Sequence, residues 1–478
     1  MGTRFISWIS RSEKRSTKPK WIAFRSSRGF ICFVVTIAVF TDVFLYGMIV
    51  PVTPTALQQK VGLSSDHEQK WTSILLALYA AALLAVSPVS GYLADRMQTR
   101  RWPLLTGLVA LAASTSLLCV GNTLGLWIAG RIFQGASAAV VWTVGLALLV
   151  DTVGKESLGQ FLGYTSMGLS LGAMTGPLLG GVIYQSGGYY AVFATAFAVI
   201  GVDIVLRLAL IEKRHAAPWL ESEKVSREEQ VTHYSQETKS VATEADRTAI
   251  AEKPVPAVLR LLASPRLLSS LWSYFIIALL LASFDAVLPL YVQDTFGWEQ
   301  TGQGLIFIPM SIPQLINPAI GAFIDRYPGS RRYLGAGSFV CSVPVYVLLR
   351  LVTHNSMQQK ILLCALLTLL GVCIAVLIPV IILEINEIVE EEEKKSPESF
   401  GKGGAVAQAY GMSNAAFAAG SLAGPFFAGY IRTSAGWGTM AWTLGLLSGV
   451  TGLPVVLTVG GWIGTKSTGP AVEERVEA

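Results

Sequence analysis

Runs of about 20 apolar residues recur along the whole chain and are separated by polar segments. A helix rises about 1.5 Å per residue, so a run of this length spans the hydrocarbon core of a bilayer, which is about 30 Å thick. This pattern predicts an all-α polytopic membrane protein with twelve transmembrane helices in two pseudo-symmetric six-helix bundles. The runs lie at 30–52, 71–93, 103–121, 124–150, 159–184, 189–211, 268–292, 303–324, 333–352, 361–386, 404–431 and 438–463.

The sixth and seventh runs are separated by a long polar stretch with nine basic and nine acidic residues. Such a segment can bury little apolar surface, so we expect a flexible linker rather than a folded domain. Lys and Arg in the short loops gather on the side of this linker, which predicts cytoplasmic termini. The expected divisions are a basic cytoplasmic tail at 1–28, an N-terminal bundle at 29–211, a cytoplasmic linker at 212–266, a C-terminal bundle at 267–463 and a cytoplasmic tail at 464–478.

The composition agrees with a membrane protein, since 52% of the residues are hydrophobic and 14% are charged, against about 25% charged residues in soluble domains. The net charge of +5 comes largely from eight Lys and Arg among the first 28 residues. Beside an apolar helix such a tail indicates the cytoplasmic side, so we expect no nucleic-acid partner. The five cysteines form no CxxC pair and there is no HExxH motif, so we expect no disulfide, metal site, cofactor or enzymatic activity.

Two sequence blocks occur in both halves. SPVSGYLADRMQTRR at 87–101 matches NPAIGAFIDRYPGSRR at 317–332, and GAMTGPLLGG at 172–181 matches GSLAGPFFAG at 420–429. Parallel repeats of this kind let one bundle rock against the other around a site near the middle of the membrane. The first block contributes the candidate residues Gly91, Asp95, Arg96, Arg100, Gly321, Asp325 and Arg326. The alternative is an ordinary positively charged loop with an aspartate at a helix end.

A carboxylate interrupts the first run of each half. Asp42 is the only charged residue between Phe30 and Val50 and lies about 18 Å into its helix, near the middle of a bilayer. An aspartate at that depth costs about 2.5 to 3.5 kcal/mol on insertion scales, so it should face a cavity or a partner. Asp285 lies in the first run of the second half, ahead of Pro289. We expect the two acids to meet across a central cavity and to exchange protons for a cationic substrate; the alternative is that each is hydrogen-bonded and only fixes packing.

Small residues line one face of the fifth and eleventh runs. Residues four apart share a helix face, and small ones let two backbones approach closely. A single GxxxG pair is common in any membrane helix, whereas several in register predict a tightly packed helix pair. These residues are Gly168, Gly172, Gly176, Pro177 and Gly180 in the fifth run and Gly420, Gly424 and Pro425 in the eleventh.

The segment RIFQGASAAV at 131–140 places a guanidinium inside the fourth run. Arg131 lies seven residues beyond Leu124, where an unpaired charge is costly and a partner is expected. The alternative is an arginine that extends along the helix to reach the outer surface of the membrane.

Together these motifs resemble the major facilitator superfamily, in its twelve-helix drug:proton antiporter type. The sequence is similar to vesicular amine transporters and to fungal exporters of drugs and secondary metabolites. The resemblance implies that the first repeated block latches the cytoplasmic ends of the bundles and that the glycine faces seal the protein against leak. It also implies a role in proton coupling for Arg131 beside Asp42 and Asp285.

The resemblance is incomplete inside the bundles. Where vesicular amine transporters carry a lysine in helix 2 and aspartates in helices 10 and 11, this chain has Tyr79, Ile374 and Asn414. Loading of vesicles with monoamines is therefore not expected. Weaker candidates for the cavity wall are Tyr79, Gln134, Trp142, Glu384 and Asn414, with an interfacial position near the end of helix 10 as the alternative for Glu384.

The expected function is proton-coupled export of a small amphipathic organic compound, by alternating access. The alternatives are a facilitator or importer of a small nutrient and a non-transporting membrane sensor with the same fold. The expected partners are a small-molecule substrate, protons and membrane lipid, and the chain is expected to be a monomer. We expect it in the plasma membrane, or alternatively in a vacuolar or vesicle membrane.

Overall fold

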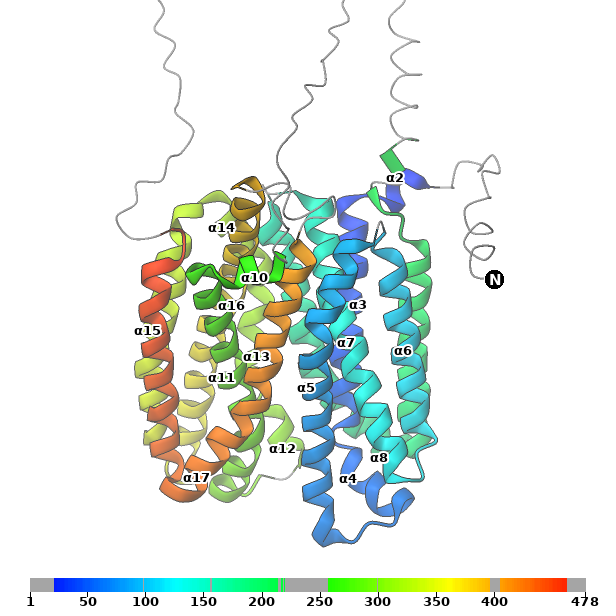
Figure 1. Ribbon diagram of the computed structural model, residues 1–478. Helices are drawn as coiled ribbons and strands as arrows, with labels where there is room; N and C mark the ends of the chain where they lie inside the picture. Colours follow the sequence, from blue (N-terminus) through cyan, green and yellow to red (C-terminus); the bar gives the residue numbers. More distant parts are fainter. Residues whose placement is uncertain are drawn as a thin grey trace, which may run out of the picture.

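The computed structural model describes residues 21–97, 99–154, 157–213, 216–217, 219, 257–298, 300–395 and 405–461. Within these ranges the chain forms helices joined by short turns, and no strand (Figure 1). Ten helical segments of this part of the chain are long and apolar enough to cross a membrane. The predicted class, an all-α polytopic membrane protein, is therefore confirmed.

The N-terminal half begins with the four-residue helix α2 and then forms the first long helix, α3, which starts where the Ser27 side chain accepts a hydrogen bond from the Phe30 N–H. A π-helical turn, η1, ends at Gly62, whose left-handed conformation stops the helix. The elements of this half are α2 (Ile22–Arg25), α3 (Arg28–Ile49), α4 (Thr53–Ala56), η1 (Leu57–Val61), α5 (Ser65–Arg96), α6 (Arg101–Cys119), α7 (Leu124–Val153) and α8 (Leu158–Ala209).

The C-terminal half repeats this order after the short helix α10, which lies inside the predicted linker. Its first long helix, α11, ends at Gly297 in the left-handed conformation. The elements are α10 (Ala257–Leu262), α11 (Pro265–Phe296), α12 (Gln300–Leu305), α13 (Ile308–Ser311), η3 (Ile312–Ile316), α14 (Asn317–Arg326), η4 (Pro328–Ser330), α15 (Arg331–Leu348), η5 (Leu349–Leu351), α16 (Met357–Lys395) and α17 (Val406–Thr458).

Two of the helical segments are long enough to cross a membrane twice. α8 has 52 residues and breaks at Gly188, where φ is 77°, and α17 has 53 residues and breaks at Gly436, where φ is 85°. Only glycine adopts such a backbone readily, so each break is a turn between two helices. Both glycines fall in the predicted gaps after the fifth and eleventh runs. The structure is thus consistent with twelve crossings.

The eighth predicted run is not one continuous helix. The sequence predicts a single span at 303–324, but the structure has α12, α13, the 3₁₀ segment η3 and α14 in its place. The physical reason is proline, which lacks a backbone N–H and clashes with the preceding turn. Pro309, Pro313 and Pro318 fall at the start of α13, η3 and α14.

The tenth predicted run is too short. The sequence places Glu384 near the end of helix 10, but α16 continues to Lys395. Several glutamates of this extension are bonded, which explains why the helix persists. Glu387 pairs with Arg331, Glu391 pairs with Arg266 at 2.7 Å, and Glu393 accepts from the Ala405 N–H at 2.7 Å.

The two halves lie beside each other, with the N-terminal half on the right of Figure 1 and the C-terminal half on the left. α2, α10 and α14 lie at one end of the bundles, which we call the terminal end, and α4 and α12 lie at the opposite end. α5 packs on α17 and α8 packs on α14, so each half contributes one element to each contact. Both predicted tails and the linker fall largely outside the described residues, so their limits stay predictions.

Candidate transport site

The glycine faces of α8 and α17 hold the first helix of each half in place. A Cβ added at Gly168 would lie 2.8 Å from the Thr36 carbonyl oxygen, and one at Gly180 would lie 2.3 Å from that of Met48. In the second half, a Cβ at Gly424 would lie 2.5 Å from the Leu279 carbonyl oxygen. Glycine permits these approaches because it has no side chain. The same spacing recurs along both faces, so α3 and α11, which carry Asp42 and Asp285, have little freedom to shift; a role in preventing leak stays a prediction.

Asp42 lies in a buried pocket of side chains in the N-terminal half. Its side chain is fully buried, and its Oδ2 accepts hydrogen bonds from Trp142 Nε1 at 3.2 Å and from the Tyr79 hydroxyl at 3.5 Å. Its Oδ1 has no hydrogen-bond partner among the described residues. The two predicted cavity candidates Tyr79 and Trp142 are thus brought to Asp42. One carboxylate oxygen is left able to bind a proton.

Arg131 is also fully buried and has neutral partners. Its Nη1 donates to Gln134 Oε1 at 2.9 Å, and its Nη2 donates to Thr53 Oγ1 at 3.3 Å. The guanidinium carbon lies 5.7 Å from the centre of the Tyr46 ring, a cation–π arrangement. No ion pair joins Arg131 to an acid among the described residues, and its Nε has no partner there. The predicted burial is therefore present, and the alternative of an arginine reaching the surface is not.

Tyr46 connects these groups and was missed by the sequence reasoning. The centre of its ring lies 4.5 Å from that of Tyr79, and its hydroxyl is near enough to Arg131 and Asp285 for both charges to act on it. A single tyrosine in an apolar helix gives no sequence signal. Its position four residues after Asp42, on the same helix face, was the available hint.

Asp285 differs from Asp42 in its surroundings. Its side chain is accessible to solvent although it lies well inside α11 with protein around it, so it borders an opening within the bundle. It is near enough to Tyr46 of the N-terminal half to act on it electrostatically. No hydrogen bond or ion pair joins Asp285 to Asp42 among the described residues. The structure thus brings Asp42 together with Tyr79 and Trp142, and Arg131 with Gln134, whereas direct contact between the two acids is not seen.

Three weaker candidates are not open cavity walls, and the expectation is corrected for them. Gln134 is fully buried beside Arg131, and Asn414 is buried and donates to Ser87 Oγ at 2.7 Å. Glu384 is fully buried and pairs with Arg266 at 2.7 Å near the terminal end. It also accepts from the Gly460 N–H at 3.0 Å, so it joins α16 to α11 and to the end of α17.

At the terminal end, Asp95 joins the two halves where α5 meets α17. Its carboxylate accepts from the backbone N–H groups of Ala407 at 3.0 Å and Gln408 at 2.8 Å. Arg100 also pairs with Asp95, at 3.2 Å, and with Asp151, at 3.2 Å. A carboxylate at a helix N-terminus is favourable because the first N–H groups have no partner within the helix.

The second repeat builds a matching contact where α14 meets α8. Asp325 accepts from the backbone N–H groups of Gly159 at 2.8 Å and Gln160 at 2.9 Å. A Cβ at Gly321 would lie 1.9 Å from the Gly159 carbonyl oxygen, as one at Gly91 would lie 2.4 Å from that of Ala407. We call the α5–α17 contact crossing A and the α8–α14 contact crossing B. The predicted residues Gly91, Asp95, Arg100, Gly321 and Asp325 all lie at these crossings.

Two predicted members of the latch lie elsewhere. Arg96 is exposed with its guanidinium over the Tyr92 ring at 4.2 Å, and Arg326 is exposed near the ring of Tyr327. In the second half Arg331 takes the position that corresponds to Arg100 and pairs with Glu387 of α16. The one-residue insertion in the second block hides this correspondence in the sequence.

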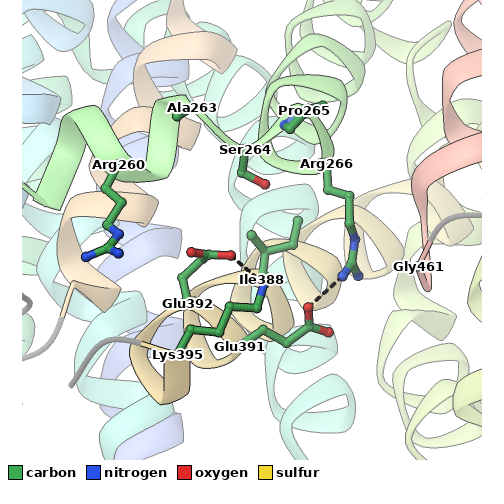
Figure 2. Close-up of a pocket in the computed structure, with 10 residues that line it drawn as sticks. All are labelled: Arg260, Ala263, Ser264, Pro265, Arg266, Ile388, Glu391, Glu392, Lys395 and Gly461. Carbon is green, nitrogen blue, oxygen red and sulfur yellow. Dashed lines mark hydrogen bonds and ion pairs between the residues drawn. The ribbon is translucent and has the colours of Figure 1, made fainter. Parts of the chain in front are cut away.

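A separate pocket of about 500 Å³ lies at the terminal end of the C-terminal half (Figure 2). Its lining includes Arg266, Glu391, Glu392 and Lys395. Arg266 is paired with Glu384 and Glu391, and Lys395 with Glu392. The pocket holds none of the residues around Asp42, so it is distinct from the candidate site.

Comparison with known proteins places the chain among transporters. The family model "Major Facilitator Superfamily" matches residues 35–396 and 314–468. The chain is 35% identical over 419 residues to the uncharacterized MFS-type transporter C18.02 of Schizosaccharomyces pombe, covering 86% of this chain and 91% of that protein. It is 25% identical over 328 residues to the probable vesicular acetylcholine transporter-B of Danio rerio, covering 66% of this chain and 60% of that protein.

A solved structure shows the same fold. The crystal structure of the human organic anion transporter MFSD10 superimposes with a TM-score of 0.64, at 17% sequence identity, and covers 92% of this chain and all of that one. The family model and these relatives thus confirm the expected resemblance to the major facilitator superfamily, and the solved structure agrees with its fold.

Proposed function

The chain belongs to the Major Facilitator Superfamily, and on that premise we propose that it is a proton-coupled antiporter that exports a small amphipathic organic compound. One observation carries the proposal: Asp42 is fully buried in the first helix, and among the described residues its hydrogen bonds, from Trp142 and Tyr79, reach only one of its oxygens. A buried carboxylate is costly to keep charged and therefore binds a proton more readily than one in water.

The two acids divide the work of exchange. Asp42 is sealed from solvent and serves as the proton site, while the exposed Asp285 is the acid that a cationic group of the cargo meets first. Tyr46 is near enough to feel the charge of Asp285, and its ring is 5.7 Å from the guanidinium carbon of Arg131. Binding of cargo at Asp285 changes the field at Tyr46 and Arg131, and so couples the two halves. The contacts at crossings A and B close the terminal end in this conformation, which we assign to the cytoplasmic side.

Transport in proteoliposomes tests the proposal. Purified protein is reconstituted, and uptake of ethidium, an amphipathic cation, is followed with and without an imposed proton gradient. The expected result is accumulation that requires protons on the trans side and stops when an ionophore removes the gradient. Uptake that is indifferent to the gradient would refute coupling and favour a facilitator.

The direction of flux separates export from import. The terminal end is first located by protease protection of a tag at the C-terminus. With protons driven toward that end, net movement of ethidium away from it would support export. Net movement toward it, together with the protons, would refute export while leaving proton coupling intact.

A further inference from the structure

The two crossings at the terminal end share a backbone arrangement but differ in their side chains. Gly411 lies against the Ser87 carbonyl oxygen at crossing A, where an added Cβ would lie 2.5 Å from that oxygen. Gly163 lies against the Asn317 carbonyl oxygen at crossing B, where the same distance would be 2.4 Å. Ser87 thus corresponds to Asn317, and Asn414 of α17 corresponds to Ser166 of α8. The serine and asparagine have changed places between the crossings.

This exchange leaves crossing B with an unsatisfied amide. At crossing A, Asn414 donates to Ser87 Oγ at 2.7 Å. At crossing B, Asn317 is fully buried, and neither its Oδ1 nor its Nδ2 has a hydrogen-bond partner among the described residues. A buried polar group without a partner destabilises the state that buries it, and separation of the helices would let water reach it.

The acids of the two crossings also differ, and the acid of crossing A again has more partners than that of crossing B. Asp95 at crossing A is buried and receives an ion pair from Arg100 in addition to two backbone N–H groups. Asp325 at crossing B is half-buried, and among the described residues it accepts from the two backbone N–H groups and forms no ion pair. Arg331 pairs with Glu387 instead and acts on Asp325 only at longer range.

The helices themselves differ as well. α5 is continuous through crossing A, whereas α14 follows the 3₁₀ segment η3, and such a segment inside a longer helix often marks a hinge. One side-chain bond holds the hinge itself: Ser170 of α8 donates to Gln314 Oε1 at 2.6 Å. It fixes η3 to α8 deeper in the bundle than Asn317, so α14 can swing while η3 stays in place.

From these differences we infer that the terminal end opens asymmetrically: α14 swings about η3 and crossing B separates before crossing A, with Asn317 as the residue that biases it. The inference rests on the proposed function, because alternating access requires this end to open. Asn317 is a positioning residue that acts through the equilibrium between closed and open states, without contact to cargo.

Distances between spin labels test the order in which the crossings open, and they need neither cargo nor a proton gradient. In a background with the native cysteines replaced, nitroxides are attached at Met97 and Val406 for crossing A and at Tyr327 and Ser157 for crossing B. Wild-type protein is expected to show a larger separated population at crossing B. Equal populations at the two crossings, or a larger one at crossing A, would overturn the inference.

Substitutions then test the role of the amide. Asn317→Leu keeps a similar size and removes both unpaired polar atoms, so the ratio of separated to closed protein at crossing B should fall about fivefold, the factor for about 1 kcal/mol. The double change Ser166→Asn/Asn317→Ser copies crossing A and should act in the same direction. The opposite exchange, Ser87→Asn/Asn414→Ser, should raise separation at crossing A.

The outcomes distinguish this inference from the proposed function. An unchanged ratio in both Asn317→Leu and Ser166→Asn/Asn317→Ser would overturn the role of Asn317. If the ratio shifts as expected while ethidium uptake is independent of the proton gradient, the asymmetric opening is supported and the proposed proton coupling is refuted.

Discussion

Asp42 and Asp285 lie in corresponding helices of the two halves, yet one is sealed and the other is exposed. Asp42 has two side-chain donors on one oxygen, while no hydrogen bond or ion pair involves Asp285 among the described residues. The backbones around them are alike, since glycine faces fix α3 against α8 and α11 against α17. The repeat thus preserves the scaffold and varies the chemistry inside it. An acid kept from solvent suits storage of a proton, and an exposed one suits contact with cargo.

The sharpest test of this division replaces each acid in turn. Asp42→Asn keeps the size of the side chain and removes its proton chemistry, so gradient-driven accumulation of ethidium should be abolished. Asp285→Asn should weaken ethidium binding and leave residual movement coupled to protons. Full coupled transport by the folded Asp42→Asn protein would rule out Asp42 as the proton site. Identical losses of ethidium transport in both variants would show that the two acids do not have separate roles.

The glycine faces occur in both halves, so a large side chain on either face should lower the stability of the protein by a similar amount. Leucine at Gly180 or Gly424 would force apart backbones in direct contact, and overpacking of this kind costs about 3 kcal/mol or more. Thermal unfolding in detergent and the yield of monodisperse protein measure the effect. Gly181→Leu and Gly429→Leu are matched controls, because nothing lies within 4 Å of a Cβ at either position. Damage as large in the controls would show that the close approaches are not the cause.

Each half also has an ion pair with a buried acid, and removal of that acid should destabilise the protein in both cases. Arg207 Nη2 lies 2.7 Å from Asp203 Oδ2 in the N-terminal half, and Arg266 Nη2 lies 2.7 Å from Glu384 Oε1 in the C-terminal half. Asp203→Asn leaves the buried Arg207 without an acid and should cost about 3 kcal/mol in unfolding free energy. Glu384→Gln should cost less than that, because Arg266 keeps its ion pair with Glu391.

A second partner of the same arginine provides the control. Arg266 also pairs with Glu391, whose side chain is 41% exposed, so Glu391→Gln should cost less than about 1 kcal/mol. Equal losses for Glu384→Gln and Glu391→Gln would mean that burial does not set the strength of these pairs.

The smallest expected effect concerns the two donors to Asp42. The Trp142 bond is 3.2 Å and the Tyr79 bond is 3.5 Å, at the limit of a useful hydrogen bond. Trp142→Phe should therefore slow coupled ethidium transport about tenfold, since hydrogen bonds to charged groups contribute about 1.5 kcal/mol or more. Tyr79→Phe should change it less than about threefold. A larger effect at Tyr79 would indicate that its ring contact with Tyr46 matters more than its hydroxyl.

Much of the fold was predictable because lipid imposes simple rules on sequence. Long apolar runs predict the spans, and Gly188 and Gly436 fall in gaps that the pattern already indicates. The breaks in the eighth span were also visible, as three prolines, but length alone favoured one helix. The extension of α16 was hidden, because its glutamates are stabilised by partners far away in the chain, such as Arg266.

The candidate site was predictable only in part. A charged residue in an apolar run is conspicuous, so Asp42, Arg131 and Asp285 stand out in the sequence. The groups that determine their surroundings are ordinary residues such as Tyr46 and Thr53, and only the packing of helices brings them together. Arg96 and Arg326 show the reverse case, since a matching motif does not determine where a flexible side chain points.

Proton movement driven by cargo tests the central claim most directly. Proteoliposomes that contain a pH-sensitive dye receive an ethidium gradient and no proton gradient, and the internal pH is recorded. For wild-type protein the account predicts that protons move opposite to ethidium, and for Asp42→Asn that ethidium moves without them. Ethidium flux through wild-type protein with no change in internal pH would contradict it.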